Sequence, residues 1–415
     1  MESLRRRFPS RLLQPPSDDA IGSSMDVEAR LQNRVSLSLK AKAKPKSASA
    51  KQMAAQAANA ARRRSKWSGM APSRGDVLLG ARSLLERVKI KPTTSHNYAV
   101  PVADFLKWCQ EEELRVDSSI RIGLSALEYA DFMFLEGRPL SAIGTFRAGL
   151  LHYLPELRDS VYVVERLKDA QESWSLKEPP ATRLPLPHYG AWAVIGRTAQ
   201  RGEIRTALAM VTQLRTYVRP SELLKLRAAD VVAPSSVAVT GMEAMYGLIL
   251  NAVHSKGGEE IMEDPEPGKT GNFNENMLFD LPDELWVGKS LAKLAGSLHR
   301  HQRLFNFSQE QYNQSLKKSL AECQMAHLNA TSYVWRHTGV SLDHLCNRRS
   351  EQSIKARARW VTDTSVKRYK KATLALRQSS LVPDPVLRYG KEVEAALEGW
   401  FFGVKDLPQP SWPLP

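Results

Sequence analysis

The chain has 415 residues and a net charge of +15 at pH 7; 42% of its residues are hydrophobic and 25% are charged. This length allows at least two domains with substantial cores, and the charge favours a polyanionic partner. No apolar run approaches the roughly 18 residues of a membrane span, no signal-peptide core follows Met1, and the odd number of cysteines, three, suits a reducing compartment. We therefore expect an intracellular protein with no membrane partner.

The positive charge is concentrated at the N-terminus. Residues 1–75 hold 16 Lys or Arg against five Asp or Glu, a net charge of +11, and the remaining 340 residues contribute only +4. Two basic runs, 40–46 and 62–66, flank a stretch rich in Ala, Gln and Ser. We predict a disordered or transiently helical arm that binds phosphates or acts as a nuclear-import signal, and we expect a nuclear location. A solvated tail that merely raises solubility is an equal alternative.

Residues 76–178 have the apolar periodicity of a small helical domain. One predicted helix has apolar residues at i, i+3, i+4 and i+7: Val102, Phe105, Leu106 and Cys109. A second stripe consists of Leu127, Ala130, Phe134 and Leu135 and ends at Gly137 and Pro139. Two more helices are expected at 141–154 and 161–175. Four prolines then mark 179–187 as a stiff linker.

Residues 188–375 form the next predicted domain, and 376–415 form a C-terminal tail. An apolar helix face leads to Arg219: Ile204, Ala207, Leu208, Val211 and Leu214. Short strands are expected at 246–250 and 276–280, within a three-stranded portion around 230–280, after which helices resume. The predicted fold class is mainly α with a small antiparallel β-sheet.

Three motifs in this second half carry residues suited to phosphodiester chemistry. The first is Arg219-Pro-Ser-Glu222, and the second is Arg336-His-Thr-Gly. In the third, Trp360 lies 24 residues after Arg336, and Tyr369 follows Trp360 by nine residues. A guanidinium group binds phosphate oxygens with a planar fork and stays protonated at any working pH. Each motif alone is a weak signal, but their order and spacing together are a strong one.

In order and spacing these motifs resemble those of the tyrosine recombinase, or phage integrase, family. The resemblance implies a helical core-binding (SAM-like) domain over 76–178 and an integrase-like α+β catalytic domain over 188–375. It implies site-specific recombination or integration of double-stranded DNA by a homo-tetramer, with no metal or other cofactor and with a mobile-element origin. The few Cys and His pairs fit no standard zinc-ligand spacing.

The resemblance also assigns roles. Arg219 and Arg336 would stabilise the transition state. Tyr369 would attack the phosphorus and leave a 3′-phosphotyrosyl link that can be rejoined without ATP. The Trp360 indole would donate a hydrogen bond to a phosphate oxygen. The family's histidine in the second box falls on Tyr333, which donates a hydrogen bond but is a poor base near neutral pH. The acceptor of the nucleophile's proton is therefore open, with His337 the nearest imidazole in sequence.

In the family, a lysine on a β-hairpin protonates the departing 5′-oxygen. The segment between the two predicted strands contains Lys269 within Pro-Gly-Lys-Thr-Gly, and we assign this role to Lys269. Lys256 in Ser-Lys-Gly-Gly is the alternative, because an acidic insertion blurs the register.

The segment 348–371 contains nine Lys or Arg against two acidic residues. Because it flanks the proposed nucleophile, we predict that it holds DNA. The predicted DNA-binding residues are Arg348, Arg349, Lys355, Arg357, Arg359, Lys367 and Arg368. The tail after residue 375 either packs on a neighbouring protomer or covers its own domain.

Two other functions remain open. A non-catalytic DNA-binding relative would keep the fold and lose the chemistry, and Tyr333 in the histidine place favours this reading. A type IB topoisomerase uses a related residue set, but its extra clamp domains need more chain.

Overall fold

The computed structural model describes residues 61, 92–114, 116, 118–179, 184–234, 245–253, 272–363, 366 and 372–413. The chain divides into two compact units, Met1–Pro180 and Ala181–Pro415. Several predicted residues lie outside the described part: Lys256, Lys269, Lys367, Arg368, Tyr369 and the basic runs of the arm.

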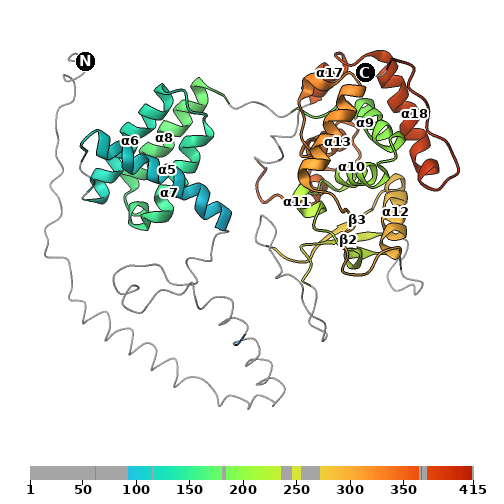
Figure 1. Cartoon of the computed structure of the whole chain (residues 1–415), viewed down its shortest axis with the longest axis horizontal. Coiled ribbons are helices and arrows are strands. Elements are labelled where there is room, and N and C mark those ends of the chain that lie inside the picture. The colour runs from blue at the N-terminus through green and yellow to red at the C-terminus, as the bar shows by residue number, and fades with distance from the viewer. Residues whose placement is uncertain are drawn as a thin grey trace, which may run out of the picture. The chain divides into compact units, whose positions relative to one another are not determined.

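Unit 1 contains four helices in its described part (Figure 1). They are α5 (Pro92–Glu111), α6 (Ser119–Leu135), α7 (Ser141–Tyr153) and α8 (Val161–Lys177), with a 3₁₀ turn η3 (Pro155–Arg158) before α8. Three aromatic rings meet at the centre of this bundle, Phe105, Tyr129 and Phe146, with centroids 5.1 to 5.3 Å apart. Such tilted aromatic pairs add to the burial of apolar area. The core-binding role of unit 1 stays a prediction.

The second predicted stripe was wrong in its orientation. Phe134 and Leu135 are 36% and 81% exposed, and the buried face of α6 consists of Ala126, Tyr129, Ala130 and Met133. Residues 132–135 at the end of α6 are all apolar, so the periodicity alone did not fix the buried face. In α5, Phe105 and Cys109 are buried as predicted, but Leu106 is 48% exposed.

Unit 2 combines helices with one small sheet. Its helices are α9 (His188–Gln200), α10 (Ile204–Thr216), α11 (Pro220–Leu223), α12 (Leu285–Gly296), α13 (Gln309–Glu322), α14 (Val334–Leu345), α15 (Glu351–Arg357), α17 (Ala372–Ser379) and α18 (Asp384–Phe401). Strands β1 (Val231–Val232), β2 (Gly247–Leu250) and β3 (Glu275–Leu278) form an antiparallel sheet in that order. Leu248 pairs with Val231 on one side and Met277 on the other. The predicted fold class, mainly α with a small antiparallel sheet, is confirmed.

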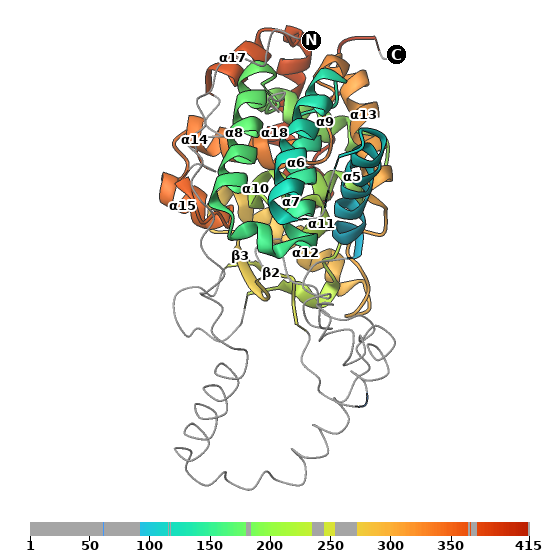
Figure 2. The ribbon, with the colours of Figure 1, turned by 90° about the vertical axis from the view of Figure 1, so that its left-hand side faces the viewer.

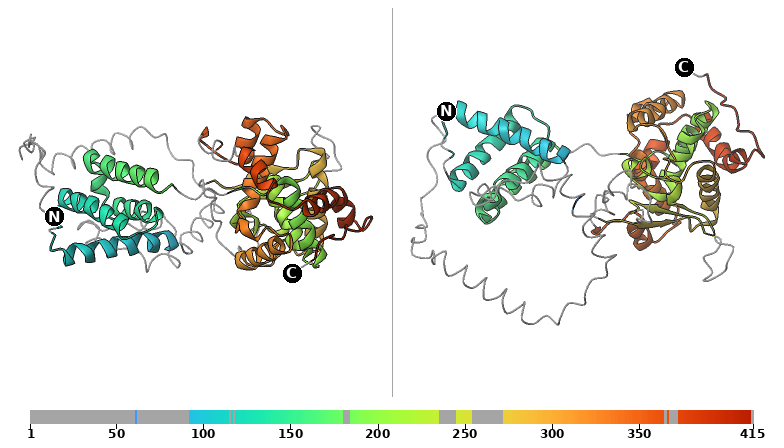
Figure 3. Two further views of the ribbon diagram at one scale, coloured as in Figure 1. Left: turned by 90° about the horizontal axis from the view of Figure 1, so that it is seen from above. Right: turned by 60° about the horizontal axis from the view of Figure 1, so that its bottom comes forward.

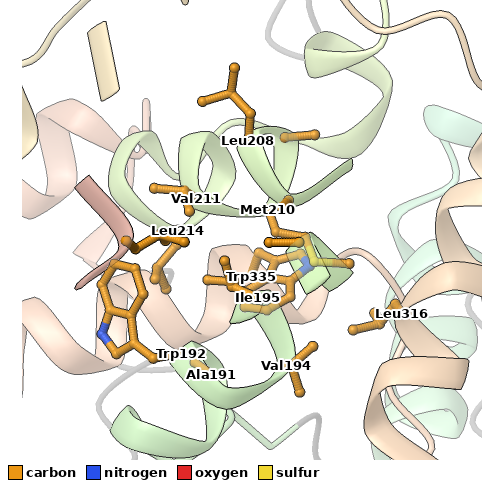
Figure 4. Packing of buried hydrophobic residues seen from close by; sticks show 14 of the residues in the cluster. Ala191, Trp192, Val194, Ile195, Leu208, Met210, Val211, Leu214, Leu316 and Trp335 are labelled. Carbon is orange, nitrogen blue, oxygen red and sulfur yellow. The ribbon is translucent and has the colours of Figure 1, made fainter. Parts of the chain in front are cut away.

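The core of unit 2 is built around α9 and α10, which are buried almost on every side. Residues 190–199 of α9 and 206–216 of α10 are all buried. Trp192 and Ile195 of α9 face Val211 and Leu214 of α10, and the fully buried Trp335 of α14 packs among them (Figure 4). The sheet lies at one end of these helices, and α12 contacts its strand β1 (Figures 1 and 2). A helix enclosed in this way holds the residues that follow its last turn in fixed positions.

The C-terminal segment covers its own unit. Helix α18, drawn in dark red, lies along α9, drawn in green (Figure 3). Beyond it, the Trp412 indole donates to the Glu322 carbonyl at 2.7 Å, and the Gln200 amide donates to the Pro408 carbonyl at 2.5 Å. The two alternatives for this segment were packing on a neighbouring protomer and covering its own domain. In the structure it covers its own domain.

Gly339 sets the close approach of α14 to α10. A Cβ atom at this position would lie 2.9 Å from Tyr217 Cδ1 and closer still to the Leu214 carbonyl oxygen. Both contacts are with atoms of a well-packed element that has no room to move. The close approach brings Arg336, one helical turn earlier on α14, within reach of the end of α10.

We therefore expect Gly339→Ala to destabilise unit 2 by roughly 3 kcal/mol, because the added methyl group forces two packed helices apart. Urea denaturation followed by tryptophan fluorescence measures this change. Gly296→Ala is the matched control, since a Cβ atom there meets nothing within 4 Å. Equal unfolding midpoints for the two variants would show that the helices do not need this glycine.

Candidate functional site

Arg219 is held at the start of α11 by a rigid turn. It is the residue before the helix, with an extended backbone, and Pro220 is the first helical residue. The Glu222 carboxylate accepts the Arg219 backbone N–H at 2.8 Å and its Nη1 at 2.6 Å. These two hydrogen bonds from Arg219 to one carboxylate fix both the turn and the side chain. The Arg219 side chain is 12% exposed.

Tyr217 ends α10 in a left-handed conformation, with φ of 56°. Such a conformation costs a non-glycine residue about 1–2 kcal/mol. The phenol is fully buried and donates to the Asp343 carboxylate of α14, while its ring lies 5.8 Å from the Arg357 guanidinium. Burial, with Asp343 nearby, raises the pKa of Tyr217 well above its ordinary value. The neutral phenol therefore anchors the turn that leads to Arg219.

Arg336 is fully buried and joins two chain segments. Its Nη1 donates to the Tyr217 carbonyl, and its Nη2 donates to the Ala358 carbonyl at 2.6 Å. The guanidinium carbon lies 5.3 Å from the centre of the Trp360 ring, a cation–π contact. Arg336 thus ties the end of α10 to the segment after α15 and places Trp360 beside it.

Arg359 follows α15 in a left-handed conformation, with φ of 55°. Its backbone N–H donates to the Ala356 carbonyl, and the next N–H, of Trp360, donates to the Lys355 carbonyl. This is the hydrogen-bond pattern of a Schellman cap. The Arg359 side chain, 8% exposed, pairs with the Glu222 carboxylate, and its Nε lies 3.4 Å from Glu275 Oε2 on β3.

These contacts define an arginine cluster: Arg219, Arg336 and Arg359, with Glu222 and Glu275. Burial lowers the pKa of Arg359. The Glu222 and Glu275 carboxylates raise it in part, but the nearby Arg336 and Arg219 guanidiniums lower it further, so it stays below its ordinary value. Arg359 therefore lies close enough to Arg336 and Arg219 for their charges to repel its own. Burial raises the pKa of Glu222, but Arg359 and Arg219 outweigh burial and hold that pKa below its ordinary value.

Tyr333 joins the edge of the cluster. Its phenol is hydrogen-bonded to the Arg219 side chain. Burial lowers the pKa of Arg219, but Glu222 and Tyr333 outweigh burial and hold that pKa above its ordinary value. The rings of Tyr333 and His337 are 5.6 Å apart. Of the predicted catalytic residues, the structure therefore brings together Arg219, Tyr333, Arg336 and Trp360.

Three of the predicted DNA-binding arginines lie in a second, internal network. Arg349 pairs with Asp280 at 2.5 Å, with Glu284 at 2.8 Å and with Asp343 at 2.5 Å. Arg357 pairs with Glu284 at 3.0 Å, and Arg348 with Asp283 at 2.8 Å. The side chains of Arg349 and Arg357 are only 3% and 6% exposed. Their guanidiniums are occupied inside the protein, and their contact with DNA stays a prediction.

Lys355, which belongs to the same basic run, is 31% exposed and pairs with Asp363 at 2.5 Å.

Two residues of the arginine cluster were not predicted as site residues. Glu222 was part of the first motif, so its place there could have been found. Glu275 had no such signal, because it reaches the cluster only through the folding of β3.

Within the described residues, no group of three or more His, Cys, Asp or Glu side chains has the arrangement of a metal site. In the same part of the chain, no helix is long and apolar enough to cross a membrane.

No protein-family model and no curated protein matches the chain. Two similar solved structures are recombinases. The crystal structure of the XerH site-specific recombinase bound to a palindromic difH substrate, a post-cleavage complex, is 14% identical, covers 68% of this chain and 78% of that chain, and has a TM-score of 0.43. The crystal structure of XerA recombinase is 15% identical, covers 68% of this chain and 98% of that chain, and has a TM-score of 0.33. The function proposed below rests on the site residues and not on these similarities.

The depressed pKa of Glu222 predicts a pH effect on stability. A carboxyl whose folded pKa lies below its unfolded value, about 4.3 for Glu, stabilises the fold above that unfolded value. The contribution is lost as pH falls through the folded pKa. We expect the free energy of unfolding of the parent to fall more steeply below about pH 5 than that of Glu222→Gln, by up to about 1.4 kcal/mol per pH unit.

Urea denaturation at a series of pH values measures this difference. Glu398→Gln, which removes an exposed carboxylate of α18, is the matched control. Parallel pH curves for the parent and Glu222→Gln would contradict the role of the ion pairs.

Proposed function

We propose that this chain breaks and rejoins DNA strands through a 3′-phosphotyrosyl intermediate, with the arginine cluster as its phosphate site and Tyr369 as its nucleophile. The observation that carries the proposal is the convergence of Arg219, Arg336 and Trp360. These residues come from separate motifs and lie close together in the structure. In the sequence, the motifs have the order and spacing of the tyrosine recombinase boxes.

The charge of the cluster suits a phosphodiester. Three guanidiniums and two carboxylates leave one net positive charge, which one phosphodiester monoanion balances. The pentacoordinate transition state carries further charge on its non-bridging oxygens, and buried guanidinium groups stabilise such charge more strongly than water does.

In the proposed step, the Tyr369 oxygen forms a bond to phosphorus and the phenol gives its proton to a base, for which His337 is the candidate. The bond from phosphorus to the 5′-oxygen breaks, and that oxygen takes a proton from Lys269, or from Lys256 as the alternative. The reverse sequence rejoins the strand. The energy of the phosphodiester bond stays in the phosphotyrosyl ester, so no oxidant, reductant or nucleotide is consumed.

Tyr333 has a different role from the histidine that it replaces. Its hydrogen bond to Arg219 supports a role in orienting that guanidinium. Both terminal nitrogens of Arg336 donate hydrogen bonds to backbone carbonyls. A direct contact between Arg336 and a phosphate therefore requires one of these hydrogen bonds to break. These two observations favour the second candidate, a DNA-binding protein that does not cleave.

The proposed partner is double-stranded DNA, bound by four protomers in the nucleus, and the proposed origin is a mobile element. Residues 181–415 hold 30 Lys or Arg against 23 Asp or Glu, whereas residues 92–180 hold nine against 14. We therefore expect the net positive charge of unit 2 and of the N-terminal arm to provide the non-specific attraction to DNA phosphates. A core-binding role for unit 1 depends on where its individual basic residues lie.

The covalent step gives the sharpest test. A DNA duplex nicked just beyond the scissile phosphate loses a short fragment after cleavage, which traps the enzyme on the strand. On its own recombination site, the parent should form a denaturant-resistant adduct that peptide mass spectrometry maps to Tyr369.

Tyr369→Phe removes only the hydroxyl, so it should bind the same DNA and form no adduct. An adduct formed by Tyr369→Phe would assign the nucleophile to another residue. A parent protein that binds its site without forming any adduct would favour the non-cleaving function.

A further inference from the structure

We propose that Arg359 is a third phosphate-binding arginine of this site, and that Glu275 is its counter-ion in the DNA-free protein, displaced when a DNA phosphate binds. The inference rests on the proposed function, because it names a further residue that contacts the phosphodiester.

The backbone at Arg359 gives the first argument. The position after α15 is left-handed, and glycine is the residue that adopts this conformation without a steric penalty. Gly137 occupies the corresponding position after α6. The left-handed residues Glu113, Gln324 and Asn347 at other helix ends are exposed. Tyr217 and Arg359 are buried at theirs, and of these two only Arg359, 8% exposed, carries a charge. Keeping a strained backbone and a buried charge at this position costs free energy that glycine would save, so we expect the Arg359 side chain to have a function that compensates for this cost.

The hydrogen bonding of the guanidiniums gives the second argument. Nε and Nη1 of Arg359 and Nε of Arg219 are buried, and no acceptor among the described residues forms a hydrogen bond with them. A buried charged donor without an acceptor costs more than an ordinary lost hydrogen bond. A phosphodiester brings two anionic oxygens, each able to accept from more than one guanidinium.

The two carboxylates of the cluster are held unequally. Glu222 bonds the backbone and side chain of Arg219 and pairs with Arg359. The contacts of Glu275 are longer: it accepts from the Asn251 amide at 3.4 Å, and it reaches Arg359 Nε at 3.4 Å without forming a hydrogen bond to it, whereas Glu222 accepts from Arg219 at 2.6 and 2.8 Å. Glu275 is therefore the carboxylate that an incoming phosphate displaces at lower cost, while Glu222 keeps both arginines in place.

A double-mutant cycle tests this exchange in the full chain. The affinity for a fluorescein-labelled duplex of arbitrary sequence is measured by anisotropy over a series of KCl concentrations. Arg359→Gln should weaken binding roughly tenfold at low salt and reduce the slope of log affinity against log salt by about one. Glu275→Gln should strengthen binding several-fold in the parent. In the Arg359→Gln background it should have no effect, because Glu275 acts through Arg359.

Two exposed residues of α18 provide matched controls. Arg388→Gln and Glu398→Gln make the same charge changes on an element that contributes nothing to the arginine cluster. Arg359→Gly is the second variant at the site, since glycine fits the left-handed backbone and protects against misfolding. It should bind DNA as weakly as Arg359→Gln while unfolding at a temperature no lower than that of Arg359→Gln.

The inference is overturned if Glu275→Gln strengthens binding equally in both backgrounds, because Glu275 then acts as a distant charge. It is also overturned if Arg359→Gly and Arg359→Gln bind like Arg388→Gln. A parent protein that binds duplex but fails these comparisons leaves the proposed function intact. A parent that binds no duplex contradicts the proposed function itself, and this inference with it.

Discussion

The sharing of one buried carboxylate, Glu222, between two arginines is the interaction on which the site depends. Glu222 caps its own helix at Arg219 and pairs with Arg359, which comes from a segment far along the chain. Without it, Arg219 and Arg359 would be like charges in a buried environment, and breaking a buried pair in this way costs about 3–5 kcal/mol. The site can therefore concentrate positive charge because it carries its own counter-charge.

The surrounding fold supports this arrangement from one side. Tyr217 provides both a strained backbone turn and a phenol that bonds Asp343, and its carbonyl receives Arg336. Gly339 permits α14 to lie close enough to α10 for these contacts. The internal network of Arg348, Arg349 and Arg357 then joins α14 and α15 to the segment before α12. Packing, hydrogen bonds and ion pairs thus converge on the same few backbone positions.

The sequence motifs predicted the meeting of Arg219, Arg336 and Trp360, because motif order and spacing report a shared site even when each motif is weak alone. They could not predict Glu275, whose place depends on strand pairing between residues distant in sequence. The basic run from residue 348 was interpreted as a DNA-facing surface. The acids that occupy its arginines, Asp280 to Glu284 and Asp343, come from other elements, so a count of local charge could not reveal their burial.

The most direct test of the central claim is an experimental structure of Tyr369→Phe bound to a DNA duplex. The account predicts a backbone phosphate at the arginine cluster, with its oxygens about 3 Å from the guanidinium nitrogens of Arg219 and Arg359 and with Glu222 still between these two arginines. A complex in which every phosphate lies away from the cluster, and Arg359 keeps its pairing with Glu275, would contradict it.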